Sequence, residues 1–249
     1  MTAHRTPHNA EDERHVFPPK ENPFDALFAD PLYRTVKRTH FGYRYRKWKI
    51  KRYVPDTGLI LDVGSGTAPV SPDLGRTVVA DISEEALNHV HAFGKAVTSI
   101  TDMEFKPAAF DCILCSEVLE HVLDDGKAVE EMRRVLKTDG TLILTVPFQK
   151  KYWAEDDEFV GHVRRYDPGE LESLLRDRGF STIATFKLSG MLERWLTLRS
   201  LGVYRSSALA RRLPAWFFRG INLVLFWILY LQSPFLRWKT ATRILIVAR

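Results

Sequence analysis

Short apolar runs alternate with helix-like stretches along this chain from residue 58 onward. Runs rich in apolar and β-branched residues predict seven strands, at 59–63, 77–81, 96–100, 110–116, 140–147, 181–188 and 242–249. Helical spacing or capping residues predict helices between them, within 83–93, 124–137 and 167–180, the last with Pro168 near its start. Strands that alternate with helices in this way predict an α/β fold, a doubly wound and mostly parallel sheet covered by helices on both faces.

The first predicted strand breaks into a glycine-rich turn, Gly64-Ser65-Gly66. The glycines permit a tight turn and let the main chain approach a ligand closely. The turn lacks the G-x-G-x-x-G spacing of dinucleotide sites and the lysine of a P-loop, and Pro69 and Pro72 shorten any helix behind it. We therefore expect a ligand that carries a nucleoside but needs no phosphate-binding helix.

Three carboxylates stand near the ends of successive predicted strands. Asp62 lies near the end of the first strand, Asp81 ends the second strand 19 residues later, and Asp102 follows the third. Ligands of open parallel sheets bind beyond the carboxyl ends of the strands, where a carboxylate can accept hydrogen bonds from ribose hydroxyls or an adenine amino group. Each acid alone is more often a turn or capping residue, but together with Met103 they outline a nucleoside pocket.

Several segments with a familiar order follow one another: "LILDVGSGTA", "VVADIS", "SITDMEF" and "FDCILCSEVLEHVLDDGKAVEEMRRVLKTDGTLILTVP". This order resembles the class I S-adenosylmethionine-dependent methyltransferases, of the small-molecule or lipid type (methyltransferase type 11-like), over residues 58–188 and the last strand. The resemblance implies a Rossmann-like sheet of seven strands with an antiparallel last strand. It also implies S-adenosyl-L-methionine as the cofactor.

The resemblance further implies where that cofactor binds. Its methionine part would lie over the glycine turn, its ribose at the end of the second strand, its adenine after the third, and its reactive side at the end of the fourth. The expected cofactor-binding residues are Asp62, Gly64, Ser65, Gly66, Asp81, Ile82, Asp102, Met103 and Ser116. Ala68 stands where many members of the family have a third glycine, and with the two prolines it puts the first helix in doubt more than the cofactor.

Candidate catalytic residues lie after the fourth and fifth strands. Methyl transfer mainly requires alignment of the nucleophile, and a general base only where the nucleophile must lose a proton. His162 is the candidate base and His121 more readily a pocket wall, while Tyr166 either grips the substrate or fixes the loop together with Arg165. The sequence indicates no metal site.

Basic residues are concentrated in two segments. Residues 31–55 contain nine Lys and Arg and residues 194–249 contain ten, both without Asp or Glu, so the rest of the chain has 17 basic against 31 acidic residues. This segregation predicts an anionic partner surface, either a membrane or a nucleic acid. The segment Ser116-Glu117-Val118-Leu119 lacks a D/N-P-P-Y type motif, which argues against methylation of nucleic-acid bases.

An insert before the last strand contains 17 residues without a charge, 220–236, between Arg219 and Arg237. As a helix it is about 25 Å long, shorter than the roughly 30 Å of a bilayer core. Both flanking strands belong to one sheet, so the insert would have to cross a membrane an even number of times, and its charged first half excludes this. The stretch therefore enters a membrane face, packs on the domain as a lid, or is buried in a homodimer.

These observations lead to one organisation of the chain. We expect a flexible tail at 1–30, a basic helical segment at 31–56, a methyltransferase domain at 57–188 and 241–249, and a hydrophobic and basic insert at 189–240. The expected function is methyl transfer to a lipid-like or lipid-linked small molecule at an anionic membrane surface, by a cytoplasmic protein peripheral on the inner face of the membrane. The alternatives are a soluble small-molecule or RNA methyltransferase, and a binding module that transfers nothing.

Overall fold

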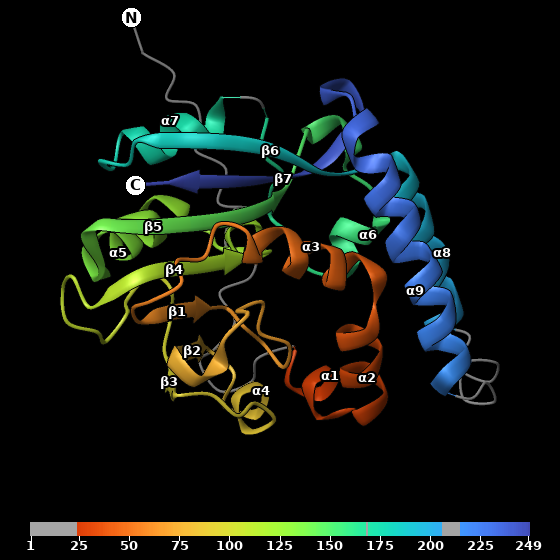
Figure 1. Ribbon diagram of the computed structural model, residues 1–249, viewed down its shortest axis with the longest axis horizontal. Helices are drawn as coiled ribbons and strands as arrows, with labels where there is room; N and C mark the ends of the chain where they lie inside the picture. The colour runs from red at the N-terminus through yellow and green to blue at the C-terminus, as the bar shows by residue number, and fades with distance from the viewer. Residues whose placement is uncertain (1–23, 168, 206–214) are drawn as a thin grey trace, which may run out of the picture.

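The computed structural model describes residues 24–167, 169–205 and 215–249, and Pro168 lies outside them. Seven strands form one sheet in the order β3-β2-β1-β4-β5-β7-β6 (Figure 1). Their bounds are β1 Ile60–Val63, β2 Thr77–Asp81, β3 Gly94–Val97, β4 Phe110–Ser116, β5 Leu136–Pro147, β6 Thr182–Gly190 and β7 Ala241–Ala248. Only β7 is antiparallel to its neighbours, so the predicted fold class is confirmed.

Several predicted elements differ from the observed ones at their ends, and β5 begins at Leu136 instead of residue 140. Strand β3 begins and ends earlier than the predicted 96–100, since its register places Val78 opposite Gly94 and Asp81 opposite Val97. The predicted helix within 83–93 is only α4, Glu84–Asn88, capped by the Ser83 hydroxyl. Between β1 and β2 there is only the 3₁₀ turn Leu74–Arg76, as the prolines led us to expect.

The sheet buries a separate apolar layer on each face because neighbouring strand residues point to opposite sides. On one face, Ile113 and Cys115 of β4 pack with helices α5, Asp125–Val135, and α7, Glu170–Arg176. On the other face, Cys112 and Leu114 pack with the end of helix α3, Phe41–Lys51. The strand ends are thereby held at fixed positions.

Three helices precede the sheet and lie at the carboxyl ends of its first strands. They are α1 Asp25–Ala29, α2 Pro31–Thr39 and α3 Phe41–Lys51. Helix α1 contacts α4 and buries Phe28, so residues 25–29, which were assigned to the tail, form a helix that packs on the domain. The part of the predicted tail before residue 24 lies outside the described residues.

The insert forms two long helices at the same edge of the molecule, where the arrowheads of β1 and β4 point (Figure 1). They are α8 Met191–Arg205 and α9 Ala215–Gln232, and residues 206–214 between them lie outside the described residues. Helix α9 packs on α3, and Leu196 of α8 joins the same apolar cluster as Leu229 of α9. None of the described helices combines the length and apolar character that a membrane crossing requires.

Candidate functional site

The glycine turn after β1 is held open by main-chain hydrogen bonds to the neighbouring strand. The amides of Gly64 and Ser65 both donate to the Ala80 carbonyl, at 2.8 and 3.2 Å. Gly64 and Gly66 have positive φ angles of 65° and 51°, which other residues rarely adopt. A Cβ on Gly64 would lie 2.3 Å from a methyl carbon of Val118, so glycine is needed there for packing as well.

The two buried aspartates at the strand ends brace this turn. Asp81 accepts hydrogen bonds from the amides of Gly66 and Ser83, at 2.8 and 2.9 Å. Asp62 accepts one from the Ser71 amide at 2.8 Å, and burial raises its pKa to about 7 against the opposing effect of that bond. Asp62 thus fixes the loop that follows the turn.

The predicted residues after β2 and β3 lie in different surroundings. Ile82 is 60% exposed and Asp102 is exposed, so both have surface to offer a ligand. Met103 is 2% exposed and belongs to the main apolar core, where its amide donates to Glu131. Burial among core side chains leaves Met103 little surface for a ligand.

The basic N-terminal segment covers the glycine turn. Lys37 lies over the Phe28 ring, 5.4 Å from its centroid, and its ammonium lies 3.0 Å from the position of a Cβ on Gly66. Burial and the charge of Arg46 lower the Lys37 pKa to about 8. Arg38 donates two hydrogen bonds to the Thr67 carbonyl. Part of the predicted basic surface is therefore used to build the site.

The end of β4 carries a fixed carboxylate. Glu117 has a positive φ of 59°, an uncommon conformation for a residue with a side chain. Its Oε2 lies 2.7 Å from Nε of Arg243 on β7 and 3.7 Å from Arg46. Burial would raise the Glu117 pKa, but these two cations outweigh it and lower the pKa to about 2. Next to it, the Ser116 hydroxyl bonds to that of Thr145.

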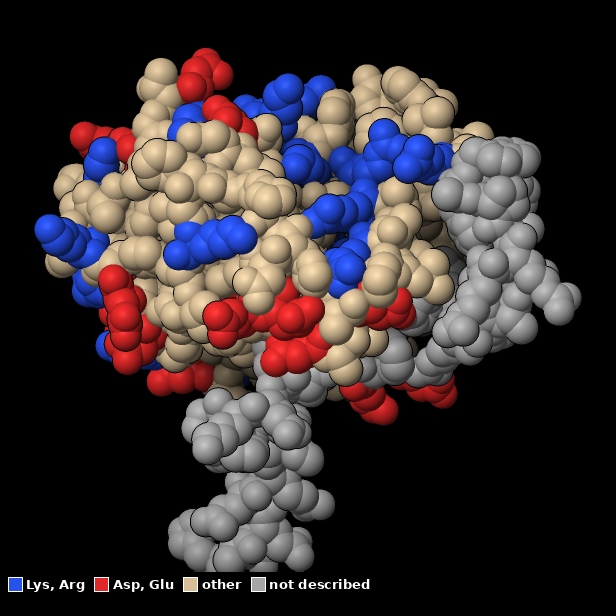
Figure 2. Space-filling model, turned by 90° about the horizontal axis from the view of Figure 1, so that it is seen from below, with Lys and Arg blue, Asp and Glu red and all other residues tan. Residues whose placement is uncertain are grey.

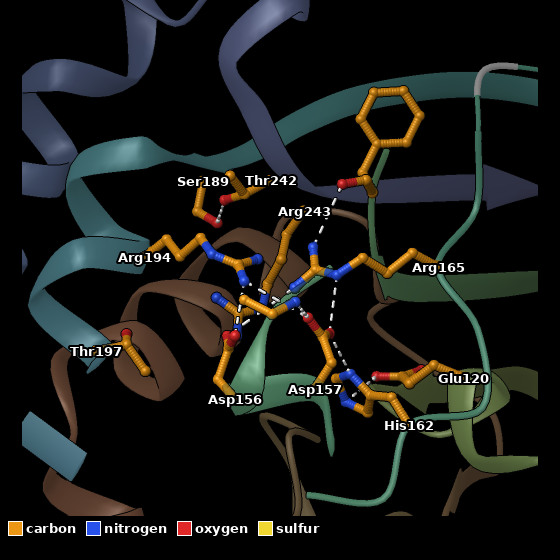
Figure 3. Close-up of polar contacts among 12 residues, drawn as sticks. Glu120, Asp156, Asp157, His162, Arg165, Ser189, Arg194, Thr197, Thr242 and Arg243 are labelled. Carbon is orange, nitrogen blue, oxygen red and sulfur yellow. Dashed lines mark hydrogen bonds and ion pairs between the residues drawn. The ribbon is translucent and has the colours of Figure 1, made fainter. Parts of the chain in front are cut away.

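Asp157 of helix α6, Glu155–Phe159, is the centre of a charged network after β5 (Figure 3). It is fully buried and lies 2.7 Å from Nδ1 of His162, 2.8 Å from Nε of Arg165 and 3.5 Å from Arg194 of α8. Burial opposes ionisation, but the bonds from His162 and Arg165 hold the Asp157 pKa well below its usual range. Asp157 therefore orients His162.

The three predicted catalytic side chains are not equivalent. The hydroxyl of Tyr166 is buried and bonds to Asp125 at 2.9 Å, and burial raises its pKa. Tyr166 thus fixes its loop, the alternative noted above. The rings of His121 and His162 lie 4.8 Å apart, and burial with the charge of His162 lowers the His121 pKa to about 4.

Sequence reasoning missed several residues of this candidate site. They are Lys37, Thr67, Glu120, Asp157 and Arg194. Only Asp157 had a signal, as one of four acids at 155–158 that precede a histidine and two arginines at 162–165. The others come from segments whose proximity only the packing of α2, α6 and α8 against the strand ends creates.

Comparisons with known proteins show similarity to methyltransferases. Residues 61–144 match a family model described as a methyltransferase domain. A probable S-adenosylmethionine-dependent methyltransferase of Mycobacterium tuberculosis (strain ATCC 25618 / H37Rv) is 29% identical over 185 residues, 66% of this chain and 68% of that protein. A ubiquinone/menaquinone biosynthesis C-methyltransferase of Enterobacter sp. (strain 638) is 26% identical over 173 residues, 52% of this chain and 69% of that protein.

A solved structure shares the fold over almost the whole chain. It is a complex between the Haloferax volcanii Trm112 methyltransferase activator and a methyltransferase, with a TM-score of 0.63, 18% sequence identity, and coverage of 92% of this chain and 97% of that chain.

Proposed function

Because the chain belongs to the class I S-adenosylmethionine-dependent methyltransferases, we propose that it methylates a lipid-like or lipid-linked acceptor at a membrane surface. The reaction class and the cofactor, S-adenosyl-L-methionine, come with the family. The acceptor is the proposed part. It is supported above all by a large apolar face on helices α8 and α9.

The strand-end residues fit the cofactor on observations of this structure. A Cβ on Gly64 would collide with Val118, and one on Gly66 would lie 3.0 Å from the Lys37 ammonium, so the turn has bare main chain next to these side chains, as close approach of a cofactor requires. The Thr67 hydroxyl oxygen is buried without a hydrogen-bond partner among the described residues, so it has capacity for a polar ligand group. Ile82 provides exposed apolar surface next to Asp81.

We assign binding roles on this basis. Asp81 retains lone pairs for ribose hydroxyls beyond the two amides that donate to it, and we assign the exposed Asp102 to the adenine amino group. The Lys37 ammonium next to Gly66 suits the carboxylate of the methionine part. S-adenosylmethionine, when bound, supplies an electrophilic methyl group on a positively charged sulfur.

His162 is the proposed proton acceptor for an acceptor group that must lose its proton. Its Nδ1 bonds to the Asp157 carboxylate, which makes Nδ1 the protonated nitrogen and leaves the lone pair on Nε2. Arg165 and Arg194 keep Asp157 ionised, so the imidazolium that forms would be stabilised. Tyr166, tied to Asp125, has a positioning role.

The apolar face of α8 and α9 is the observation that carries the acceptor class. Helix α9 uses one stripe, which includes Leu225, Phe226 and Leu229, to pack on α3. Its other sides leave large apolar side chains exposed, at Ile221, Leu223, Val224, Trp227, Ile228, Tyr230 and Leu231, and Phe235 follows at 81% exposure. Trp195 and Leu198 extend the face onto α8. Such a surface suits the interfacial region of a membrane.

A basic hollow next to this face suits anionic head groups. It has a volume of about 370 Å³ and is lined by Arg38, Thr39, Arg44, Arg219, Gly220 and Leu223. In Figure 2, Lys and Arg side chains gather near helices α1 and α2, with a group of Asp and Glu side chains below them. Each basic residue near an anionic surface contributes about 1 kcal/mol to binding. The similarity to a quinone-pathway methyltransferase also supports a lipid-like acceptor.

Flotation of the full chain with lipid vesicles tests the membrane part. We expect the chain to float with vesicles that contain phosphatidylglycerol and less with phosphatidylcholine alone. A variant with Trp227→Ser and Phe235→Ser should float less, whereas Phe93→Ser, an equally exposed aromatic near β3, should float like the unchanged chain. No flotation with either vesicle refutes the membrane proposal.

Transfer of a labelled methyl group tests the acceptor. With labelled S-adenosylmethionine and separate lipid and aqueous cell extracts, label should enter the lipid fraction. Label in the aqueous fraction would mean a soluble acceptor and a lid or dimer role for the insert, and a salt-dependent complex with RNA would favour an RNA substrate. Cofactor binding without any transfer would make the chain a binding module.

A further inference from the structure

Three potential metal ligands meet beyond the ends of β4 and β5. Glu120 and His121 belong to the 3₁₀ turn Leu119–His121, and His162 follows helix α6. One ligand atom from each lies within 4.8 Å of the others. Figure 3 shows Glu120 and His162 pointing toward one another, with 3.7 Å between Oε1 and Nε2. Forty residues lie between His121 and His162, so the sequence did not indicate this cluster.

Both histidines are oriented in the same way. Nδ1 of His162 bonds to the Asp157 carboxylate at 2.7 Å, and Nδ1 of His121 bonds to the Gly161 carbonyl at 3.2 Å. Carboxylate and carbonyl oxygens accept, so each Nδ1 carries the proton and each Nε2 has a free lone pair. Histidine ligands of metal ions almost always have their second nitrogen bound in this way.

The buried carboxylate of Glu120 is a second, independent indication of a ligand at this cluster. It is 0% exposed, and neither carboxylate oxygen has a hydrogen-bond partner among the described residues. A buried polar group without a partner is costly, and most are satisfied. Glu131, another buried glutamate, shows the usual solution, because it accepts from Arg134 and from the Met103 amide. Arg243 and Arg46, the arginines whose charges act on Glu120, pair with Glu117 instead.

We propose that Glu120, His121 and His162 bind a divalent metal ion of the Zn²⁺ type. Two imidazoles and one carboxylate form a donor set that suits Zn²⁺ and other first-row divalent ions and leaves a coordination position open. Ligand bonds of about 2.0–2.2 Å require the three side chains to close by about 1 Å from their present separation. Asp157, through its bond to Nδ1, is the residue that positions His162.

The catalytic use of this ion rests on the proposed function, whereas its binding does not. The site lies next to Ser116 and Glu117, on the side where the acceptor would approach. An acceptor hydroxyl at the open position would lose its proton to solvent more readily, as metal-bound water does, and its oxygen would then take the methyl group from the sulfonium, which leaves as the neutral thioether S-adenosylhomocysteine. The Nε2 lone pair of His162 can either bind the ion or accept a proton, so metal binding and the free-base role exclude each other.

Direct metal binding by the full chain is the test. After EDTA treatment the chain is titrated with Zn²⁺ by calorimetry, and the metal retained after desalting is measured by elemental analysis. We expect one tightly bound ion per chain. Co²⁺ in its place should give visible d–d absorption bands. Glu120→Gln, His121→Gln and His162→Gln should each weaken binding about 100-fold or more, and Asp157→Asn about 10–100-fold.

The controls separate this site from adventitious binding. His91→Gln removes an exposed histidine outside the cluster and should leave the affinity unchanged. Melting temperatures show which variants fold, and His121→Gln, at a half-buried ring, is the one least at risk. Equal Zn²⁺ affinity in the unchanged chain and in the folded cluster variants, or no retained metal, would overturn the proposal. Methyl transfer that proceeds in EDTA would remove only the metal's catalytic role and return His162 to the role of base.

Discussion

The candidate site at the strand ends and the apolar face of α8 and α9 lie at the same edge of the sheet. They differ in how far their side chains are buried and bonded to the rest of the protein. At the strand ends, carboxylates such as Asp81, Glu117 and Asp157 are held by amides or cations from several elements. On α9, apolar side chains such as Trp227 and Leu231 have large exposed fractions, 51% and 65%.

This difference distinguishes a preorganised site from an exposed surface that is stabilised only when a partner covers it. Charged groups fixed by two or more partners keep their positions before a ligand arrives, which lowers the cost of binding and reaction. Exposed apolar side chains gain free energy only when a partner removes them from water. Substitutions should therefore affect folding and cofactor binding in the first region and surface binding in the second.

The largest effect is expected for Asp157→Asn. The change removes the closest counter-charge of Arg165, which is 4% exposed, while Arg194 keeps its pair with Asp156, and it should reduce the free energy of unfolding by about 3–5 kcal/mol. Urea denaturation measures it. Glu170→Gln is the control, because its pair with Lys150 is exposed and surface ion pairs contribute at most about 1 kcal/mol. Similar losses of stability in both variants would mean that the buried network around Asp157 contributes no more than an exposed ion pair.

The second largest effect is expected for Gly64→Ala, on the affinity for the cofactor. Its Cβ would lie 2.3 Å from Val118 at a φ of 65°, so we expect at least a 100-fold loss of affinity for S-adenosylmethionine, roughly 3 kcal/mol. Calorimetry measures the dissociation constant. Gly179→Ala has a similar positive φ but no atom within 4 Å of its Cβ, and should bind the cofactor normally. An unchanged affinity in Gly64→Ala would place the cofactor elsewhere.

A smaller effect is expected at the basic hollow. Replacing Arg44 and Arg219 together by alanine removes two charges and should weaken binding to anionic vesicles about 30-fold, roughly 2 kcal/mol. Binding to neutral vesicles and the melting temperature should change little. If anionic and neutral vesicles lose binding equally, the hollow has no electrostatic role.

The smallest effect is expected for the pH dependence of stability that His40 causes at the start of α3. His40 caps α3 by accepting a hydrogen bond from the Gly42 amide. Burial lowers the His40 pKa to about 4; the charge of Glu193 opposes this shift, and the charges of Arg243 and Arg46 add to it. The unfolded chain therefore binds an extra proton between pH 6.5 and 4, and stability falls as the pH falls through this window. At pH 5.5 the loss is about 1 kcal/mol relative to pH 8.

His40→Asn isolates that contribution, because asparagine is a good N-cap that does not titrate. Urea denaturation at pH 8 and pH 5.5 should show a smaller difference between the two pH values in this variant than in the unchanged chain. Identical differences would mean that other groups cause the acid sensitivity.

Much of the fold and part of the site could be predicted from the sequence. The alternation of apolar runs and helical spacing predicted the α/β sheet, and Pro69 and Pro72 correctly indicated a missing first helix. Asp81 and Ile82 were placed at a strand end because carboxyl ends of parallel strands meet at one edge. The end of β3 was predicted too late, because only pairing with β2 decides where that strand stops.

The partners within the site depended on the tertiary structure alone. No local pattern links Lys37 to the glycine turn, Arg243 to Glu117, or Glu120 to His162, since each pair joins segments far apart in the chain. The sequence by itself determined which residues form strands, turns and an unusually apolar helix, because these follow from neighbours along the chain. Only packing decided which charges are buried together and which apolar side chains stay exposed, because both depend on how helices dock on the finished sheet.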